Sequence, residues 1–430
     1  MLRAIRGDVL HCIADPAWGA DPAAVETLAD ALVLIRDGRI ERIAPAAALL
    51  PQLGGGVAVD DWRGCLIVPG FVDAHIHLPQ VDVIAAWGAQ LLEWLQRHTY
   101  PQEQRFCDVA HARESAAFFV DELLRNGTTT AAVFCSVHPH SVDALFEQAE
   151  RRAMRLIAGK CLMDRHCPPA LADTADDGYR DSKALIERWH RRGRLGYAIT
   201  PRFAGTSSES QLQACGRLAR EHPDVWIQSH VAETRDEVAW IAQLYPQRRS
   251  YLDVYDHYGL VRERSLYGHC IWLDDDDRRR LAEAGAAAVF CPSSNLFIGS
   301  GLFDLRAARN AGHRVALGTD VGAGNSYSML RTLGDAYKVT QLLGAALPPA
   351  DLLYVATLGG ARALGLHDAI GSLQPGRDAD IAVLDPAATP LLARRTALRD
   401  DPLDRFFALT ALGDDRAVRC TYIAGEPWNR

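Results

Sequence analysis

Short apolar runs alternate with amphipathic stretches through the middle of the chain, over about residues 67–368. The amphipathic stretches, such as ESAAFFVDELLRNG and SVDALFEQAERRAM, place apolar residues at helical spacing, and several end with Gly just past a basic last turn. The apolar runs have the length and composition of buried strands: CLIVPGFVD, TTTAAVF, RLIAGKCLM, GYAITPRF, VWIQSH, SLYGHC, AAAVFCP and RVALGTD. Eight strands that alternate with helices predict an α/β fold, a TIM-like (β/α)8 barrel over residues 67–368.

The two ends of the chain have a different pattern. ALVLIRDGRIERIAP alternates apolar and polar positions across an Asp-Gly pair, which is a good hairpin signal. Near the other end, GSLQPGRDADIAVLDP and RCTYIAGEPW again read as short strands punctuated by Gly and Pro. We therefore expect residues 1–66 and 369–430 to form together one small β-sandwich domain beside the barrel.

Composition adds mainly exclusions. The 430 residues are 48% hydrophobic and 23% charged, as in an ordinary globular protein, and the net charge of −8 argues against nucleic-acid binding. No apolar stretch approaches the ~18 residues of a membrane span, and the N-terminal segment lacks the pattern of a signal peptide. Ten scattered cysteines without a compact framework indicate reduced thiols. We expect a cytoplasmic protein without nucleic-acid or membrane partners.

Polar residues stand at the ends of the predicted barrel strands, where the catalytic groups of such barrels lie. In VPGFVDAHIHLPQ, Asp73, His75 and His77 alternate, so they share one face of a strand. A lone H-x-H is common by chance. Here, however, later strands of the predicted barrel end in the polar residues Arg202, His230, His269 and Asp320, with Phe203 beside Arg202. This convergence on one mouth of the barrel predicts a metal site.

The residue types indicate which metal and which chemistry. Three imidazoles and one carboxylate suit zinc or iron(II), and the predicted ligands are His75, His77, His230 and Asp320. A water in the open position would have its pKa lowered towards ~7. Glu233 follows His230 by three residues and is placed to shuttle protons. His269 is placed to polarise the water or a developing oxyanion, and Asp73 to support the histidines from behind.

Several of these motifs carry a family resemblance. DAHIH, QSHVAE, GHC and LGTD resemble the metal signature of the amidohydrolase superfamily, whose barrel is joined to a sandwich from both termini. Some members bridge two metals with a carbamylated lysine after the fourth strand, where this chain has Arg202, so a mononuclear site is implied. Over about residues 67–345 the chain resembles the guanine deaminases in LLEWLQRHTYPQE, SVHPHSVDALFEQA, CLMDRHCP, TPRFAGTS, CPSSNLFIGSGLF and LGTDVGAGNSYSML.

The narrower resemblance implies hydrolysis of guanine to xanthine and ammonia, in purine catabolism or salvage, by water activated on one zinc or iron(II) ion per subunit. It implies that Gln80 and Arg202 hydrogen-bond the purine edge and that Phe203 stacks on its face, with Glu233 and Asp320 moving protons. A guanidinium and an amide suit the O6, N7 and ring N–H groups. A homodimer is a family-level expectation. For Leu92 and Trp94, closure over the ring and core packing are equal alternatives.

Two other functions stay open. Another ring deaminase of the superfamily would act on a pterin, a triazine or an 8-oxopurine, although Gln80, Arg202 and Phe203 together favour guanine. A non-catalytic binding protein on the same barrel would be expected to lose ligands, whereas all four predicted ligands and Glu233 are present. The unrelated zinc deaminases use P-C-x-x-C, which this sequence lacks, so that class is excluded.

Overall fold

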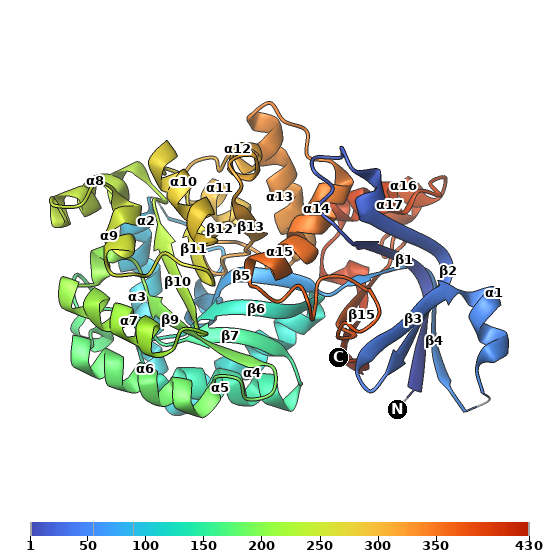
Figure 1. Ribbon diagram of the computed structural model, residues 1–430, viewed down its shortest axis with the longest axis horizontal. Helices are drawn as coiled ribbons and strands as arrows, with labels where there is room; N and C mark the ends of the chain where they lie inside the picture. Colours follow the sequence, from blue (N-terminus) through green and yellow to red (C-terminus); the bar gives the residue numbers. More distant parts are fainter. Residues whose placement is uncertain (1, 55, 89, 429–430) are drawn as a thin grey trace. The chain divides into compact units, whose positions relative to one another are not determined.

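The computed structural model describes residues 2–54, 56–88 and 90–428 (Figure 1). The chain divides into two compact units. One comprises Met1–Asp73, Glu122–Thr130 and Tyr327–Arg430, and the other comprises Ala74–Asp121 and Ala131–Ser326. The boundaries expected from the sequence, at residues 66 and 369, stay predictions.

Eight strands form a nearly closed, TIM-like barrel in which each strand lies beside its neighbour in the sequence, as predicted. The pairs from β7 to β13 are parallel. The first strand also meets the segment after the last one, because the Asp320 N–H donates to His75 O at 2.8 Å and the His77 N–H to Val321 O at 2.9 Å. The barrel strands are β5 (Phe71–His77), β6 (Thr128–Phe134), β7 (Arg155–Gly159), β9 (Leu195–Pro201), β10 (Trp226–Val231), β11 (Ser265–His269), β12 (Ala287–Phe290) and β13 (Arg314–Leu317).

Helices alternate with these strands, and their starts follow capping chemistry. The side chains of Thr174, Ser208 and Asp274 each accept the backbone N–H three residues on, at the starts of α6, α7 and α10. The acidic run after Asp274 occupies the first turn of α10, and Gly285 ends that helix with φ of 65°. The helices are α4 (Val109–Arg125), α5 (Pro139–Arg151), α6 (Ala175–Trp189), α7 (Glu209–Glu221), α8 (Arg235–Leu244), α9 (Tyr251–His257), α10 (Asp275–Ala284), α11 (Pro292–Phe297) and α12 (Leu305–Asn310).

The first connection of the barrel, between β5 and β6, is unusually elaborate. A 3-10 segment over Leu78–Val83 is followed by α2 (Leu91–Trp94), a π-helical segment over Leu95–Thr99 and α3 (Tyr100–Gln104), all before α4 begins. A short strand, β8 (Cys161–Leu162), pairs with β9 beside the barrel sequence of strands. The first connection supplies Gln80, Leu91, Trp94 and Leu95 to the cavity of the candidate site.

The terminal segments form one mixed sheet of seven strands, which confirms a separate β domain built from both ends of the chain. The predicted hairpin is present: β2 and β3 pair antiparallel, and Asp37 and Gly38 between them have φ of 51° and 81°. Hydrogen bonds join all seven strands into one continuous sheet. In sheet order the strands are β16 (Glu426–Trp428), β15 (Val418–Ile423), β14 (Ile381–Leu384), β4 (Ala58–Pro69), β1 (Leu2–Cys12), β2 (Val25–Arg36) and β3 (Arg39–Pro45).

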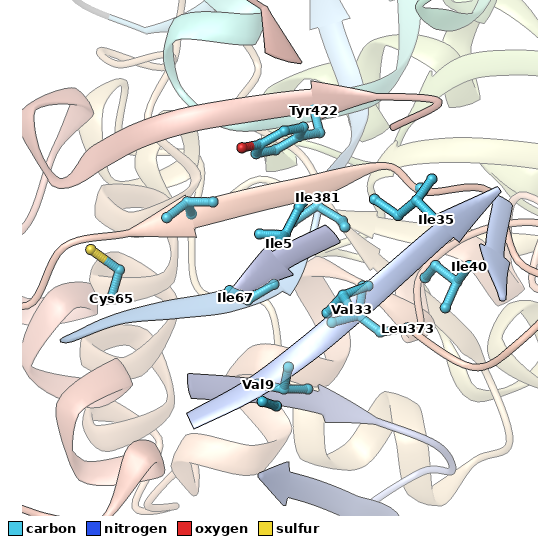
Figure 2. Close-up of a cluster of buried hydrophobic side chains, with 13 residues drawn as sticks. Ile5, Val9, Val33, Ile35, Ile40, Cys65, Ile67, Leu373, Ile381 and Tyr422 are labelled. Carbon is cyan, nitrogen blue, oxygen red and sulfur yellow. The ribbon is translucent and has the colours of Figure 1, made fainter. Parts of the chain in front are cut away.

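Successive residues of β2 enter two different hydrophobic clusters because side chains alternate between the faces of a strand. Val33 and Ile35 pack in the larger cluster, to which β1, β4 and β14 also contribute (Figure 2). Leu32 and Leu34 pack in the smaller one, with residues of α1 (Ala46–Leu49). Burial on both faces explains why this stretch of the sequence is continuously apolar. The same unit contains α13 (Met329–Leu342), α14 (Pro349–Ala356), α15 (Leu358–Ala363), α16 (Pro390–Thr396) and α17 (Pro402–Leu412).

The structure bears on the cysteines and on the search for membrane-spanning helices. All ten cysteines are free, and seven of them are buried. Within the described ranges, no helix combines the length and apolar character needed to cross a bilayer.

Candidate active site

Four side chains from three strand ends bring their ligand atoms together. His75 and His77 lie on β5, His230 lies on β10, and Asp320 follows β13. Their donor atoms all lie within 4.8 Å of one another. His230 Nε2 is 3.2 Å from Nε2 of His75 and 3.2 Å from Nε2 of His77. Asp320 Oδ1 is 3.4 Å from His75 Nε2 and 3.2 Å from His77 Nε2. We call these four residues the metal wall.

These separations fit a metal ion. Ligands about 2.0–2.1 Å from a tetrahedral ion are about 3.3–3.4 Å from each other, close to the spacings of the metal wall. The Nδ1 atom of His230 lies 2.6 Å from the carbonyl oxygen of Arg202, which accepts a hydrogen bond when that nitrogen is protonated. Nε2 then carries the lone pair and faces the other ligands, as a metal-bound histidine requires. The predicted ligand set is therefore assembled in a form suited to zinc or iron(II).

The charges of the metal wall are also those of a metal site. Burial lowers the pKa of His77 to about 4 and also lowers the pKa of His230, which in addition faces the other imidazoles. Burial alone would raise the pKa of Asp320, but hydrogen bonds from His75 and His77 outweigh it and lower that pKa. Near neutral pH the lowered pKa values keep His77 and His230 neutral and Asp320 ionised, the forms that bind metal.

The backbone is left-handed at two strand ends of the site. His269 has φ of 72° and Asp320 has φ of 52°, and both are non-glycine residues. Such conformations cost about 1–3 kcal/mol each and are retained mainly where the surrounding structure demands them. These residues turn the chain where β11 ends and shortly after β13 ends, at the two positions that supply His269 and Asp320 to the site.

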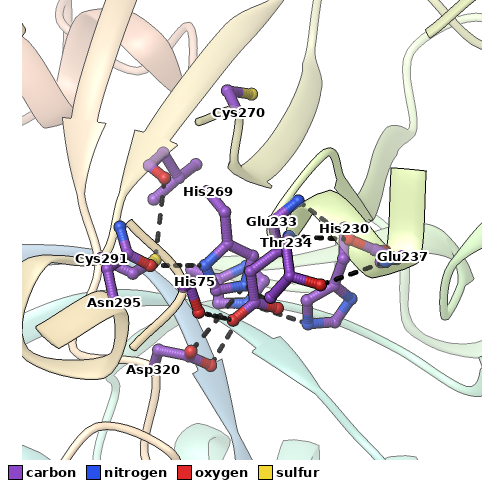
Figure 3. Close-up of polar contacts among 12 residues, drawn as sticks. His75, His230, Glu233, Thr234, Glu237, His269, Cys270, Cys291, Asn295 and Asp320 are labelled. Carbon is purple, nitrogen blue, oxygen red and sulfur yellow. Dashed lines mark hydrogen bonds and ion pairs between the residues drawn. The ribbon is translucent and has the colours of Figure 1, made fainter. Parts of the chain in front are cut away.

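Glu233 and His269 face each other beside the metal wall (Figure 3). Glu233 Oε2 lies 3.3 Å from His269 Nε2, and the Ser300 hydroxyl donates to Glu233 Oε1 at 2.7 Å. His269 Nδ1 lies 2.9 Å from Asn295 Oδ1, which accepts its N–H. Burial, and then the charge of Asp320, raise the pKa of Glu233 to about 8. A carboxyl group tuned in this way can both take up and release a proton near neutral pH.

A capping box holds the backbone around Glu233. Thr234 is the N-cap of α8 and accepts the backbone N–H of Glu237, whose own carboxylate accepts the N–H of Glu233 at 2.9 Å. The Tyr251 hydroxyl donates to the other oxygen of Glu237 at 2.7 Å. The roles of Glu237, Ser300 and Asn295 were missed in the sequence. The T-x-x-E spacing that begins at Thr234 would have revealed the first of them.

A second group of residues lines the same cavity as the metal wall. We define the ring wall as Gln80, Arg202 and Phe203, the residues that the resemblance implies hold the ring, together with Trp94, for which closure over the ring and core packing were equal alternatives. All four line the cavity. Three residues of the metal wall, His77, His230 and Asp320, line it too, and so do Glu233 and His269. The full lining is His77, Gln80, Leu91, Trp94, Leu95, Arg202, Phe203, His230, Glu233, Glu237, His269, Asp320 and Ala323.

Two predicted site residues lie elsewhere. Leu92 is not among the described residues that line the cavity, whereas Leu91 and Leu95 are. The reason is helical spacing: Leu91, Trp94 and Leu95 are related by three and four positions and share one face of the helical turn that begins at α2. Asp73 is fully buried on β5, and its supporting role stays a prediction.

A buried carboxylate that the sequence reasoning did not single out joins two residues of the ring wall. Glu103 Oε2 accepts a hydrogen bond from Arg202 Nη1 at 2.6 Å, and its Oε1 accepts one from Gln80 Nε2 at 3.2 Å. Glu103 lies on α3, in the segment LLEWLQRHTYPQE that carried part of the resemblance. Glu103 follows Tyr100 by three positions, so the two side chains share one helical face.

Comparison with known proteins gives consistent matches over nearly the whole chain. The model of the amidohydrolase family matches residues 66–427. A guanine deaminase of Escherichia coli (strain K12) is 49% identical over 428 residues, which cover 99% of this chain and 97% of that protein. The solved structure of an E. coli guanine deaminase covers 99% of both chains with a TM-score of 0.97 and 47% identity. A crystal structure of guanine deaminase from C. acetobutylicum with guanine bound in the active site covers 100% of both chains with a TM-score of 0.90 and 27% identity.

Proposed function

The chain belongs to the amidohydrolase family, and we propose that it hydrolyses guanine to xanthine and ammonia. One observation carries the proposal: residues of the metal wall and of the ring wall line a single cavity, and Glu233 lines the same cavity. A metal site alone would fit many hydrolases of this family. An amide, a guanidinium and two aromatic rings in the same cavity favour a planar, polar ring as the substrate. The relatives named guanine deaminases support the choice of ring.

We propose that one zinc ion per chain is held by His75, His77, His230 and Asp320, with iron(II) as the alternative. When bound, such an ion supplies a Lewis acid that lowers the pKa of a water molecule towards about 7. The chain itself supplies the proton acceptors around that position. Asp320 and Glu233 are ionisable carboxyl groups that line the cavity, and the His269 Nε2 atom lies between them, 3.3 Å from Glu233 and 3.9 Å from Asp320.

The proton balance of the reaction assigns Glu233 its task. Water adds to C2 of guanine, so a C–O bond forms while the adjacent ring nitrogen gains a proton. The C2–N bond to the exocyclic amine then breaks, the amine leaves as ammonia with a proton derived from the water, and C2 keeps the oxygen as the new carbonyl of xanthine. Glu233, with its pKa raised to about 8, can accept the proton from the water and deliver it to nitrogen.

The ring wall would hold the base during these steps. Gln80 and Arg202 would donate to the acceptor edge of guanine, and Phe203 and Trp94 would contact its faces. Phe203 itself packs near Trp240, with ring centroids 5.9 Å apart, which limits its movement. Because both walls line one cavity, the binding that aligns the edge would also bring C2 towards the metal wall. Positioning of this kind accounts for a substantial part of enzymatic rate enhancement.

We further propose that the enzyme works in the cytoplasm as a homodimer. The ten free cysteines support the compartment, because unpaired thiols are typical of reducing environments. The resemblance to guanine deaminases supports the dimer. Light scattering on the enzyme as it elutes from a size-exclusion column should give twice the chain mass of 47.1 kDa. A mass equal to one chain would contradict the dimer.

A panel of ring substrates tests the proposed reaction. Enzyme loaded with zinc is incubated with guanine, adenine, 8-oxoguanine, a pterin and a triazine, and ultraviolet absorbance and ammonia release are followed together. We expect guanine to be consumed with equal amounts of xanthine and ammonia and with the highest kcat/KM of the panel. A higher kcat/KM for a pterin, a triazine or 8-oxoguanine would make that compound the proposed substrate in place of guanine. No turnover of any ring would favour a binding protein.

A further inference from the structure

Glu103 lies behind the ring wall, and it is only 2% exposed. It is not among the described residues that line the cavity, so it does not reach a ligand there. Both oxygens of its carboxylate nevertheless accept hydrogen bonds from residues that do, Gln80 and Arg202. We infer that Glu103 is a positioning residue: it orients these two side chains so that the cavity presents hydrogen-bond donors, which selects a purine with two acceptors on the facing edge. This inference rests on the proposed function.

The orientation of the Gln80 amide is fixed at both ends. Its Nε2 donates to Glu103 Oε1 at 3.2 Å, and its Oε1 accepts the backbone N–H of Gly322 at 3.3 Å. A glutamine amide keeps nearly the same shape when it is turned by 180°, so only its partners decide its direction. If the Gln80 amide were turned, its oxygen would face the Glu103 carboxylate and its N–H group would face the N–H of Gly322. The close approach of Gly322 to Gln80 also depends on glycine, because a Cβ atom at position 322 would lie 2.5 Å from the backbone carbonyl oxygen of Gln80.

The Arg202 guanidinium is held in the same way. Nη1 donates to Glu103 Oε2 at 2.6 Å, and the guanidinium carbon lies 5.4 Å from the ring centre of Tyr100. Tyr100 and Glu103 both belong to α3, so one helix supplies the aromatic ring and the carboxylate that fix the group. Arg202 is 3% exposed, and within the described residues Glu103 is the one carboxylate that forms an ion pair with it. Without Glu103 a buried cation would lack its counter-charge.

The two constraints together determine what a ligand meets. A carboxylate accepts only, so it takes one N–H from each partner and leaves the remaining N–H groups of the amide and the guanidinium as the groups that can face the cavity. Guanine presents acceptors at O6 and N7 on one edge, whereas a 6-aminopurine presents an N–H donor in place of O6. A donor-only wall therefore accepts guanine and rejects its 6-amino counterpart, 2,6-diaminopurine, although both carry the 2-amino group that the reaction removes.

The experiment compares these two purines on the zinc-loaded wild type and on Glu103→Gln. In the wild type, kcat/KM for guanine should exceed that for 2,6-diaminopurine by at least about a hundredfold, since each well-formed bidentate contact discriminates by one to two orders of magnitude. In Glu103→Gln the carboxylate that excludes the Gln80 oxygen is gone, and only the Gly322 N–H still favours the original direction of the amide. The ratio should then fall at least about tenfold, mainly because KM for guanine rises, while zinc content stays unchanged. Glu103→Asp keeps the charge and should recover part of the ratio.

Glu93→Gln is the matched control, because Glu93 is exposed on the neighbouring helix α2, and it should behave as wild type. An unchanged ratio in Glu103→Gln, or an equal loss for both purines, would mean that Glu103 only supports the fold and would overturn the inference. If that variant does not fold, the wild type and Glu103→Asp decide, because wild-type turnover of 2,6-diaminopurine equal to that of guanine also overturns it. Absence of guanine turnover by the wild type would instead reject the proposed function.

Discussion

The two walls of the cavity are built in different ways. The metal wall takes its four side chains from the ends of barrel strands, where the strands fix direction and spacing. The ring wall takes its residues from a 3-10 turn, a short helix and the end of β9, and a buried carboxylate on a further helix holds two of them. The strands thus set the reactive centre, while the connecting segments set what is recognised. This difference suggests that substitutions in the metal wall remove turnover and that those in the ring wall change KM and specificity.

The largest effect should come from the metal wall. His230→Ala removes one of the four donors, and its Nε2 atom lies 3.2 Å from two of the others. Metal affinity should fall by more than about a hundredfold, since loss even of an outer supporting group costs 10–100-fold. Turnover should fall with metal content, measured by elemental analysis of the dialysed protein. If His230→Ala keeps its metal and its activity, His230 is not a metal ligand.

Glu233→Gln should separate proton transfer from metal binding. The amide keeps the size of the carboxyl group and its contact with Ser300 but cannot carry the proton. We expect kcat for guanine to fall by about 10²–10⁴-fold with KM and zinc content nearly unchanged. Steady-state kinetics and metal analysis on the same preparation check this. Activity near that of the wild type would assign the proton shuttle to another group.

Arg202→Lys should act on the other wall. Lysine keeps the positive charge beside Glu103 but loses the planar fork that pairs with two acceptors at once. KM for guanine should rise by about 5- to 150-fold, with a smaller change in kcat and no loss of zinc. A fall in kcat of the same size with KM unchanged would contradict the division of labour between the walls.

Ser300→Ala should have the smallest effect of the series. The Ser300 hydroxyl donates to Glu233 Oε1 at 2.7 Å, and Ser300 is itself buried. Hydrogen bonds to charged groups contribute about 1.5–3 kcal/mol, so loss of this one should lower kcat about tenfold and leave KM unchanged. Ser300→Thr retains the hydroxyl and serves as the control. Equal kinetics for the alanine variant and the wild type would show that Glu233 is held by other contacts.

The contrast between the walls also explains what could be predicted from the sequence. Strand ends are readable, because a buried apolar run followed by His, Asp or Arg fixes both the position and the direction of the side chain, as for His75, His230 and Asp320. Glu103 and Ser300 were missed because their partners are 23 and 67 residues away in the chain, and only the fold brings them together. For Leu92 and Trp94 two alternatives stayed open, and only the structure shows that Trp94 lines the cavity with Leu91 and Leu95. The terminal sheet was recognised from its hairpin, whereas its continuity across seven strands depends on long-range pairing.

Guanine binding to zinc-loaded Glu233→Gln, measured by isothermal titration, tests the separation of the two walls most directly. With turnover suppressed, the account predicts one guanine bound per chain, with an affinity close to the wild-type KM. Addition of Arg202→Lys to that variant should weaken binding by about 5- to 150-fold. Failure of the zinc-loaded variant to bind guanine, or binding that is indifferent to Arg202→Lys, would contradict the account.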